Sequence, residues 1–400
     1  MIASGSVQPT DVSTDDPAKD QENVSKPLLK NIDEIYSLVL KLLRLFGLYL
    51  GDTSLKRLAH TSGHYRQPSI LAIINCCVMM AGFWINVVMA IVAIFYGDDM
   101  YRFILFSLWC VLIALNATLC LFVLCVPFND TRKSRFGYLL MKLCSMNTTV
   151  SLEKVKTKST RGIIVFGFVS IFSTAGILMT SLLLKINVAY SEPWSQWLGF
   201  EIVSVIFLIV GCGPWFLPVL FYCITCCILE ALLEDLHQRI SPLRPFTLNL
   251  TAFRMEHRKL CEVVEFADKM LRLPLFGMVS VYLPLICFNF YLVVNSSPGH
   301  KFVSHISTLI FFLFAVCTLA IIMVFGSKVN EQIHSFQKDL EAFPISKDEE
   351  VKLVMFMLEL QGESKGLSVG GLAVINKSMS LTIVGVIISY FAVMLSLPRR

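Results

Sequence analysis

Charged residues are scarce in this chain, and their scarcity excludes an ordinary soluble protein. Asp, Glu, Lys and Arg make up 16% of the 400 residues, whereas hydrophobic residues make up 55%. A soluble fold of this size does not hide so much apolar surface behind so few charges. The mean hydropathy of +0.68 supports the same conclusion. The sequence therefore predicts an all-α polytopic membrane protein.

Catalytic and cofactor-binding motifs are also missing. The chain has no phosphate-binding loop, no HExxH zinc motif and no nucleophile elbow. His60 and His64 have helical spacing, but no further ligand-type residues accompany them, so we expect no metal and no cofactor. Acidic residues are rare inside the apolar runs, and Glu201 is the main one, whereas proton-coupled transporters carry several buried carboxylates. We expect a protein that is not an enzyme.

Long apolar runs dominate what is present. A helix needs roughly 20 apolar residues to cross a bilayer. The runs predict seven transmembrane helices, at Ser69–Tyr96, Phe103–Val126, Ile163–Leu184, Leu198–Leu229, Leu273–Val294, Phe302–Phe325 and Met379–Leu397.

The remaining segments divide the chain further. Residues 1–31 are polar and free of aromatics, which is typical of a disordered tail. Apolar residues at i, i+3 and i+4 predict an amphipathic helix in the region 32–67. The six-helix transmembrane domain, 69–325, carries a helical cytosolic extension at 230–272, and a cytosolic anchor region at 326–377 precedes the last span.

Lys and Arg gather on one side of the predicted membrane. The segment before the first span and the loops 127–161, 230–272 and 326–368 carry 28 of the 34, and the opposite side carries 5. Positive loops stay in the cytoplasm, so we expect a cytoplasmic amino terminus, an extracellular carboxyl terminus and a multi-pass location in the plasma membrane. G-protein-coupled receptors have the opposite orientation, which excludes that class. The bilayer is the expected partner, and we expect no nucleic acid.

Three stretches give the chain a resemblance to a known family. Leu40–Leu50 is Leu-rich with one Gly, and Phe253–Leu275 is a charged helix that leads into the fifth span. Met355–Leu397 carries the most specific pattern. In these stretches the chain resembles the insect gustatory and odorant receptor superfamily.

The family signature lies near the end of the last span and reads Thr-Tyr, five apolar residues, then Gln-Phe. Here Ser389 and Tyr390 are followed by five apolar residues and then by Ser396 and Leu397. The tyrosine and the apolar block agree with the signature, and the other three positions depart from it. The chain is thus similar to a divergent gustatory-receptor-like protein.

The resemblance implies a ligand-gated, non-selective cation channel that assembles as a homotetramer. In the family the last helix lines the pore, so 379–397 is the expected pore-lining helix. The residue three before the signature Gln forms the gate, and that position is Val393. Cytosolic helices join the subunits, so we expect 230–272 and 347–377 to form the main contact. The alternative is that these pieces form a bundle within one subunit.

Spacing in the last helix marks one face. Thr382, Ser389 and Ser396 recur every seven residues, and Val386 and Val393 lie on the same face. Hydroxyls can hydrate a passing cation, and a ring of valines can close the path by dewetting. Small residues also permit close helix packing, and spacing alone does not separate the two interpretations. The resemblance favours a pore and a gate on this face.

A small-molecule ligand is the other partner that the resemblance implies, bound in the outer halves of spans two to six. Aromatics with a few polar groups are suited to this role. The alternative for the aromatics near the membrane surface is an interfacial belt. The candidate ligand-binding residues are Trp109, Tyr190, Trp194, Trp197, Glu201, Asn289, Tyr291, His305 and Thr308.

Two other functions stay open from the sequence. A solute transporter could use a broken fourth span, because Gly211–Pro214 and Pro218 interrupt it. No partner for that break is found in the other half of the chain. A structural or assembly protein without conduction is the third possibility, given the altered signature.

Overall fold

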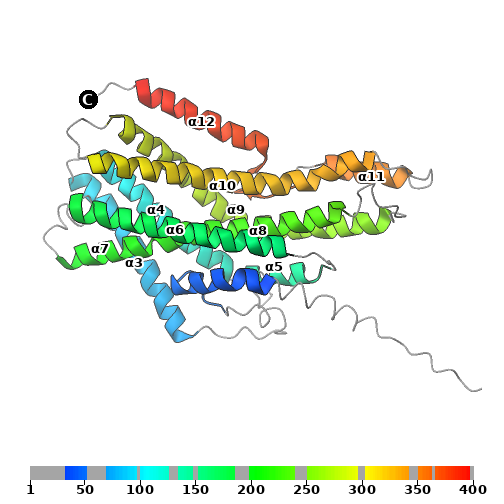
Figure 1. Ribbon diagram of the computed structural model, residues 1–400, viewed down its shortest axis with the longest axis horizontal. Coiled ribbons are helices and arrows are strands. Elements are labelled where there is room, and N and C mark those ends of the chain that lie inside the picture. Colours follow the sequence, from blue (N-terminus) through cyan, green and yellow to red (C-terminus); the bar gives the residue numbers. More distant parts are fainter. Residues whose placement is uncertain are drawn as a thin grey trace, which may run out of the picture.

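The computed structural model describes residues 32–51, 69–96, 100–125, 134–146, 152–184, 198–238, 250–295, 302–341, 350–362 and 365–396. Helices make up almost all of these residues, and the longest ones run along the long axis of the molecule (Figure 1). This arrangement confirms the all-α class. The predicted tail at 1–31 lies outside the described residues.

The elements follow one another as α3 (Ile70–Tyr96), α4 (Met100–Cys125), α5 (Arg135–Cys144), α6 (Glu153–Leu184), α7 (Leu198–Val210), α8 (Cys212–Gln238), α9 (Leu250–Asn295), α10 (Phe302–Glu341), α11 (Glu350–Gln361), β1 (Ser368–Val369), β2 (Ala373–Val374) and α12 (Lys377–Ser396). A further helix at 32–45 precedes them. In the bundle α3 packs on α4, α4 on α9, α9 on α10, α10 on α8 and α8 on α6.

Six of the described helical stretches are long and apolar enough to cross a membrane: Ile70–Tyr96, Phe103–Cys125, Val205–Gln238, Leu250–Val294, Thr308–Gln337 and Lys377–Ser396. Each contains or overlaps a predicted span. The predicted third span, Ile163–Leu184, is helical as part of α6. Most side chains in its outer half lie outside the description, so its passage through the membrane stays a prediction.

Two helices are much longer than a bilayer requires. At 1.5 Å per residue, the 46 residues of α9 extend about 69 Å and the 40 residues of α10 about 60 Å. The hydrocarbon core of a bilayer is about 30 Å thick, so both helices continue beyond it. The helical extension leading into the fifth span is thereby confirmed, and the sixth helix likewise continues past Phe325, the predicted end of its span.

The predicted break in the fourth span is slight. The helix is interrupted only at Gly211, between α7 and α8. The amide of Gly211 still donates to the carbonyl of Phe207 at 2.8 Å, and the amide of Trp215 donates to the carbonyl of Gly211 at 3.1 Å. The helix is therefore not unwound at Gly211, in contrast to the broken helices of transporters.

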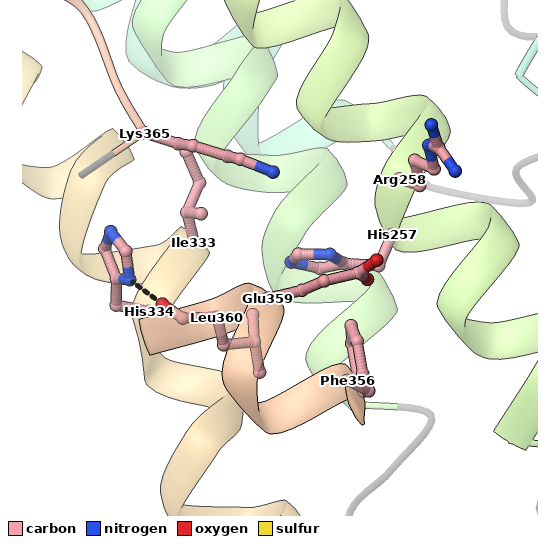
Figure 2. A pocket seen from close by; sticks show the side chains of 8 residues that line it. All are labelled: His257, Arg258, Ile333, His334, Phe356, Glu359, Leu360 and Lys365. Atoms are coloured by element: carbon pink, nitrogen blue, oxygen red, sulfur yellow. Dashed lines mark hydrogen bonds between the residues drawn. The ribbon is translucent and has the colours of Figure 1, made fainter. Parts of the chain in front are cut away.

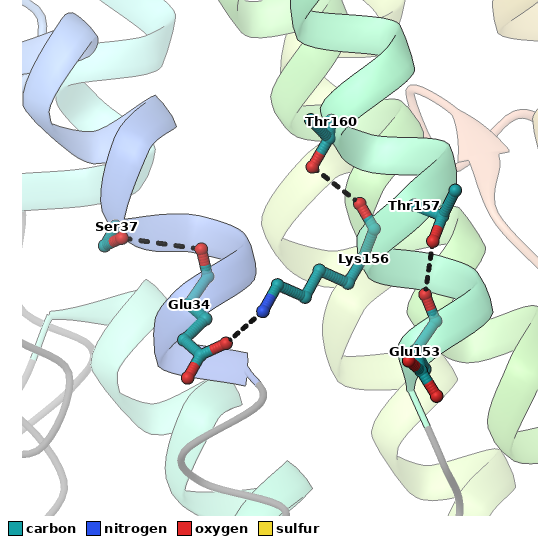
Figure 3. Close-up of polar contacts among 6 residues, drawn as sticks. All are labelled: Glu34, Ser37, Glu153, Lys156, Thr157 and Thr160. Atoms are coloured by element: carbon teal, nitrogen blue, oxygen red, sulfur yellow. Dashed lines mark hydrogen bonds and ion pairs between the residues drawn. The ribbon is translucent and has the colours of Figure 1, made fainter.

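The amphipathic amino-terminal helix packs against the chain itself. The Tyr36 hydroxyl lies 2.9 Å from Oγ1 of Thr225 in α8, and its ring meets Phe136 of α5 edge-on, with centroids 5.2 Å apart. At the start of the same helix, Glu34 forms an ion pair with Lys156 of α6 (Figure 3). These contacts hold the helix against three elements of the bundle.

A short hairpin connects α11 to α12. Its strands β1 and β2 pair in antiparallel register, and Gly370 at the turn has φ +67°, a conformation that favours glycine. On α9, the Asp268 carboxylate accepts hydrogen bonds from the amide of Ser368 at 2.6 Å and from its hydroxyl at 2.7 Å. Next, Asn376 caps α12 by accepting a hydrogen bond from the amide of Met379 at 2.8 Å. The base of α12 is thus tied to α9.

Candidate functional site

An aromatic cluster occupies the interior between α4, α8 and α10. Trp109 meets Trp215 edge-on with ring centroids 4.5 Å apart, and Phe311 lies 5.4 Å from Trp109. Edge-on pairs of this kind stabilise each other beyond the burial of their surface. Trp109 itself is half-buried at this position.

A chain of hydrogen bonds links the cluster to α9 and α10. The indole N–H of Trp215 donates to the Tyr282 hydroxyl at 2.9 Å. Tyr282 is hydrogen-bonded to Thr318, whose own hydroxyl donates to the carbonyl of Phe314 at 2.7 Å. Sequence reasoning missed Trp215, Tyr282 and Thr318, because their pairing joins positions far apart in the chain. The available signal was a tryptophan directly after Pro214, inside an apolar span.

Asn289 lies on the same buried face of α9, seven residues beyond Tyr282, and is fully buried. Its amide nitrogen donates to the carbonyl of Leu285 at 2.8 Å. Its side-chain oxygen has no hydrogen-bond partner among the described residues. A buried acceptor without a partner costs roughly 1–3 kcal/mol, so this oxygen is suited to accept a hydrogen bond from a bound molecule.

The other predicted ligand-binding residues are placed less completely. Tyr291 lies near the carboxyl end of α9, His305 and Thr308 lie near the amino end of α10, and all three are half-buried. Glu201 lies in α7, but its side chain is outside the description. Tyr190, Trp194 and Trp197 fall in the undescribed segment between α6 and α7. The structure thus sets Trp109 and Asn289 in the interior and leaves the proposed surface aromatics untested.

The predicted pore face of α12 is exposed in the single chain. Thr382, Val386, Ser389, Val393 and Ser396 are all exposed, and Val393 shows 58% of its surface. Beside this face Ile383 is buried, and on the opposite side of α12 Phe391 stacks on Phe290 of α9 with centroids 3.8 Å apart. Figure 1 shows α12 at the edge of the bundle, with one side open.

The hydroxyls on this face are held by their own helix. Thr382 donates to the carbonyl of Ser378 at 3.0 Å, Ser389 to that of Gly385 at 2.8 Å, and Ser396 to that of Val393 at 2.7 Å. With each proton directed to the backbone, the oxygen lone pairs remain to face outward. Such a face can contact a cation, and it can equally pack against a neighbouring helix.

A family model described as "7tm Chemosensory receptor" matches residues 36–395, which is nearly the whole chain. The chain belongs to this chemosensory receptor family. The match confirms the resemblance that the sequence indicated, and the family is one of receptors, not of enzymes. No curated protein matches the receptor.

Solved structures support the same assignment of fold. The receptor is similar to the insect olfactory receptor OR5 from Machilis hrabei, with a TM-score of 0.68 and 13% identity, over 95% of this chain and 100% of that one. The same OR5 in complex with eugenol gives a TM-score of 0.67 and 12% identity, with equal coverage. The receptor is therefore a polytopic membrane protein with the architecture of an insect olfactory receptor.

Proposed function

We propose that this receptor is a cation channel opened by a small extracellular ligand. The observation that carries the proposal is the asymmetry of α12. One side packs on α9 and α10, whereas the side with the hydroxyl and valine residues meets no other part of the described chain closely enough to be buried. A transmembrane helix with this pattern is suited to line a water-filled path between subunits.

The proposed assembly is a homotetramer. A single copy of α12 cannot enclose a pore, so further copies must complete it. The cytosolic α11 gives a second reason, because Val351, Val354, Met355 and Leu358 are all more than half exposed on one face. An apolar stripe outside the membrane needs cover, and the same helix of another copy is the natural occupant. The described helical parts of 230–272, in contrast, bury Leu232, Leu260 and most of their other apolar residues within the subunit, with Met255 exposed.

The ligand region that we propose comprises Trp109, Asn289 and the polar residues outward of them, with Tyr190, Trp194, Glu201, Tyr291, His305 and Thr308 as further candidates. Aromatic rings next to an unpaired amide oxygen suit a small organic molecule that carries a hydrogen-bond donor. Eugenol, bound by the structurally similar OR5, is a phenol and therefore a reasonable first probe. The inner orientation of the amino terminus and the plasma-membrane location follow the distribution of Lys and Arg.

Whole-cell recording across a panel of small organic molecules, with eugenol included, tests the proposal. We expect at least one compound to evoke a cation current, and alanine at both Trp109 and Asn289 to shift its dose–response curve. A stable tetramer on the cell surface that stays silent across the panel would favour a structural protein. A monomer that moves solute would favour a transporter, although the nearly continuous backbone at Gly211 gives that function little support.

A further inference from the structure

A cavity of about 170 Å³ between α9, α10 and α11 has charges that are balanced within the receptor (Figure 2). Arg254 binds the Glu359 carboxylate with two hydrogen bonds, and the same carboxylate acts electrostatically on Lys365. The Arg258 guanidinium points away from the space. A surplus of positive charge lies elsewhere, in the first turns of α6.

The start of α6, residues 153–161, carries four cations and one carboxylate. Lys156 is turned towards the amino-terminal helix and forms an ion pair with Glu34 (Figure 3). The carboxylate of Glu153 lies in the first turn, where negative charge stabilises a helix. The other three cations, which we call the basic stripe, are exposed and belong to none of the ion pairs among the described residues: Lys154, Lys158 and Arg161.

The basic stripe occupies one face of α6. Its members are separated by four and then three residues, so they lie within about 60° of one another around the helix axis. The same row continues with four-, three- and four-residue steps through apolar side chains that are 59%, 60% and 71% exposed: Val165, Phe168 and Phe172. One open face of the helix is therefore basic at its start and apolar further along.

The acidic group nearest to Lys158 on the neighbouring helices is already engaged. Lys158, Lys328 of α10 and Glu230 of α8 all act electrostatically on Cys227, which places them close together. The Glu230 carboxylate lies 4.0 Å from the ammonium group of Lys328. Two cations thus share one carboxylate, and this corner of the receptor keeps a positive charge.

The basic stripe crosses the expected surface of the membrane. The predicted third span begins at Ile163. At 1.5 Å per residue, Arg161 lies about 3 Å outside the span, Lys158 about 7.5 Å and Lys154 about 13.5 Å. The headgroup layer is about 5–8 Å deep on each side of a bilayer. The stripe therefore runs from the headgroups into the water beyond them, and the apolar row faces the acyl chains.

We propose that this face of α6 binds a phosphoinositide of the cytoplasmic leaflet, with its acyl chains on the apolar row and its phosphates on the basic stripe. Clusters of Lys and Arg directly cytoplasmic of a span are typical of sites for such lipids. The cytoplasmic position rests on the proposed orientation of the amino terminus, whereas binding to this face does not.

The depth of the stripe favours a phosphoinositide over phosphatidylserine. A phosphoinositide carries one phosphate at the glycerol and further phosphates on a ring that projects from the membrane, which suits cations at successive depths. The charges of phosphatidylserine stay within the headgroup layer and would leave Lys154 without an anion. Arginine and lysine are the usual protein partners of phosphate oxygens.

The test is a thermal-unfolding titration of the full-length receptor in nanodiscs of neutral phosphatidylcholine. Either a phosphatidylinositol bisphosphate or phosphatidylserine is included, at matched total lipid charge and constant ionic strength. We expect saturable stabilisation by the phosphoinositide, since a ligand that binds only the folded state raises its stability with concentration. Phosphatidylserine should bind at least tenfold more weakly.

Substitutions on α6 separate a site from simple charge attraction. Lys154→Gln, Lys158→Gln and Arg161→Gln should each weaken phosphoinositide binding about fivefold, and Lys158→Arg should retain it. Lys156→Gln is the matched control, because it removes one charge from the same helix on the side that pairs with Glu34. It should leave the binding unchanged.

The inference is overturned if the phosphoinositide stabilises the receptor no more than phosphatidylserine does, or if Lys156→Gln weakens binding as much as Lys158→Gln. Equal stabilisation by soluble inositol trisphosphate in neutral nanodiscs would also overturn it, because the apolar row would then contribute nothing. Should one variant fail to fold, the other two glutamine variants and Lys158→Arg still decide the result. Both faces of a nanodisc are accessible and no current is measured, so failure here is independent of the orientation and of the channel.

Discussion

Two buried asparagines, Asn116 in α4 and Asn289 in α9, carry amide atoms that find no hydrogen-bond partner in the described chain. Asn116 is 1% exposed and adjoins a cavity of about 20 Å³ between α4, α8 and α9. Both residues cost stability in an apolar interior. They differ in depth along the bundle, and only Asn289 lies in the proposed ligand region.

Replacing each asparagine by leucine separates stability from ligand recognition. Leucine has the same branched shape and no amide to leave unsatisfied, so Asn116→Leu and Asn289→Leu should each raise the stability of the receptor by about 1–3 kcal/mol. Thermal unfolding in detergent measures this. Asn289→Leu should also raise the half-maximal ligand concentration tenfold or more, whereas Asn116→Leu should leave it unchanged. An unmoved dose–response curve for Asn289→Leu would refute the placement of the ligand.

At this scale the sequence indicated two of the residues on which the proposed ligand region rests. Trp109 and Asn289 were candidates because they sit inside apolar spans of the outer half. The hydrogen bond from Trp215 to Tyr282 joins residues 67 positions apart, and no local pattern indicates which helices adjoin. Glu201 and the aromatics before α7 were chosen by the same reasoning and stay predictions.

Among the elements, α12 carries the sharpest expectation. Val393→Ser should produce current without ligand, because a hydroxyl ring wets a constriction that valines keep dry. Val393→Trp should abolish current by filling the path. Patch-clamp recording of both variants tests this. Tyr390→Ser is the control, since Tyr390 is exposed on a different side of the helix. Leak from Tyr390→Ser, with no effect at Val393, would move the pore to that side.

The hairpin before α12 is the second element with a testable role. Asp268→Ala removes both hydrogen bonds to Ser368, and bonds to a charged acceptor contribute about 1.5–3 kcal/mol each. With the base of α12 released, the maximal ligand-evoked current should fall severalfold. The single-channel conductance should not change, because the pore face is untouched.

Glu265→Ala provides a matched control one turn earlier in α9. Its exposed ion pair with Lys269 is of the kind that stabilises little, so its currents should resemble those of the wild type. Equal loss in both variants would mean that α9 as a whole, and not its link to the hairpin, controls the current.

Periodicity predicted the helices well but not their ends. The long α9 follows from charged helical spacing that runs directly into an apolar span. The helix of the sixth span, α10, continues to Glu341 although its hydropathy falls, because Ile333, Phe336 and Leu340 bury one face against neighbouring helices. The pairing of the hairpin with α9 depends on tertiary contact, and no feature of residues 365–376 indicated a strand.

For the whole molecule, we propose that the exposed apolar stripe of α11 governs assembly. Val354→Asp places a charge among Val351, Met355 and Leu358, and a charge cannot be buried there without a partner. We expect the tetramer to dissociate, seen as a later elution on a sizing column. Lys352→Asp alters charge on the same helix away from the stripe and should preserve the assembly. Unchanged elution of Val354→Asp would contradict a role for α11 between subunits.

The single helix α9 carries both the buried Asn289 and Asp268, which contacts the hairpin. The directions in which these two side chains point around the helix axis are therefore fixed relative to each other. Each added residue turns everything beyond it by about 100° and advances it by 1.5 Å. One inserted alanine between these positions would point either the amide or the carboxylate at the wrong neighbour. Relatives of this receptor should therefore vary in length within their loops. Insertions inside α9 should be tolerated only when the added residues complete whole helical turns.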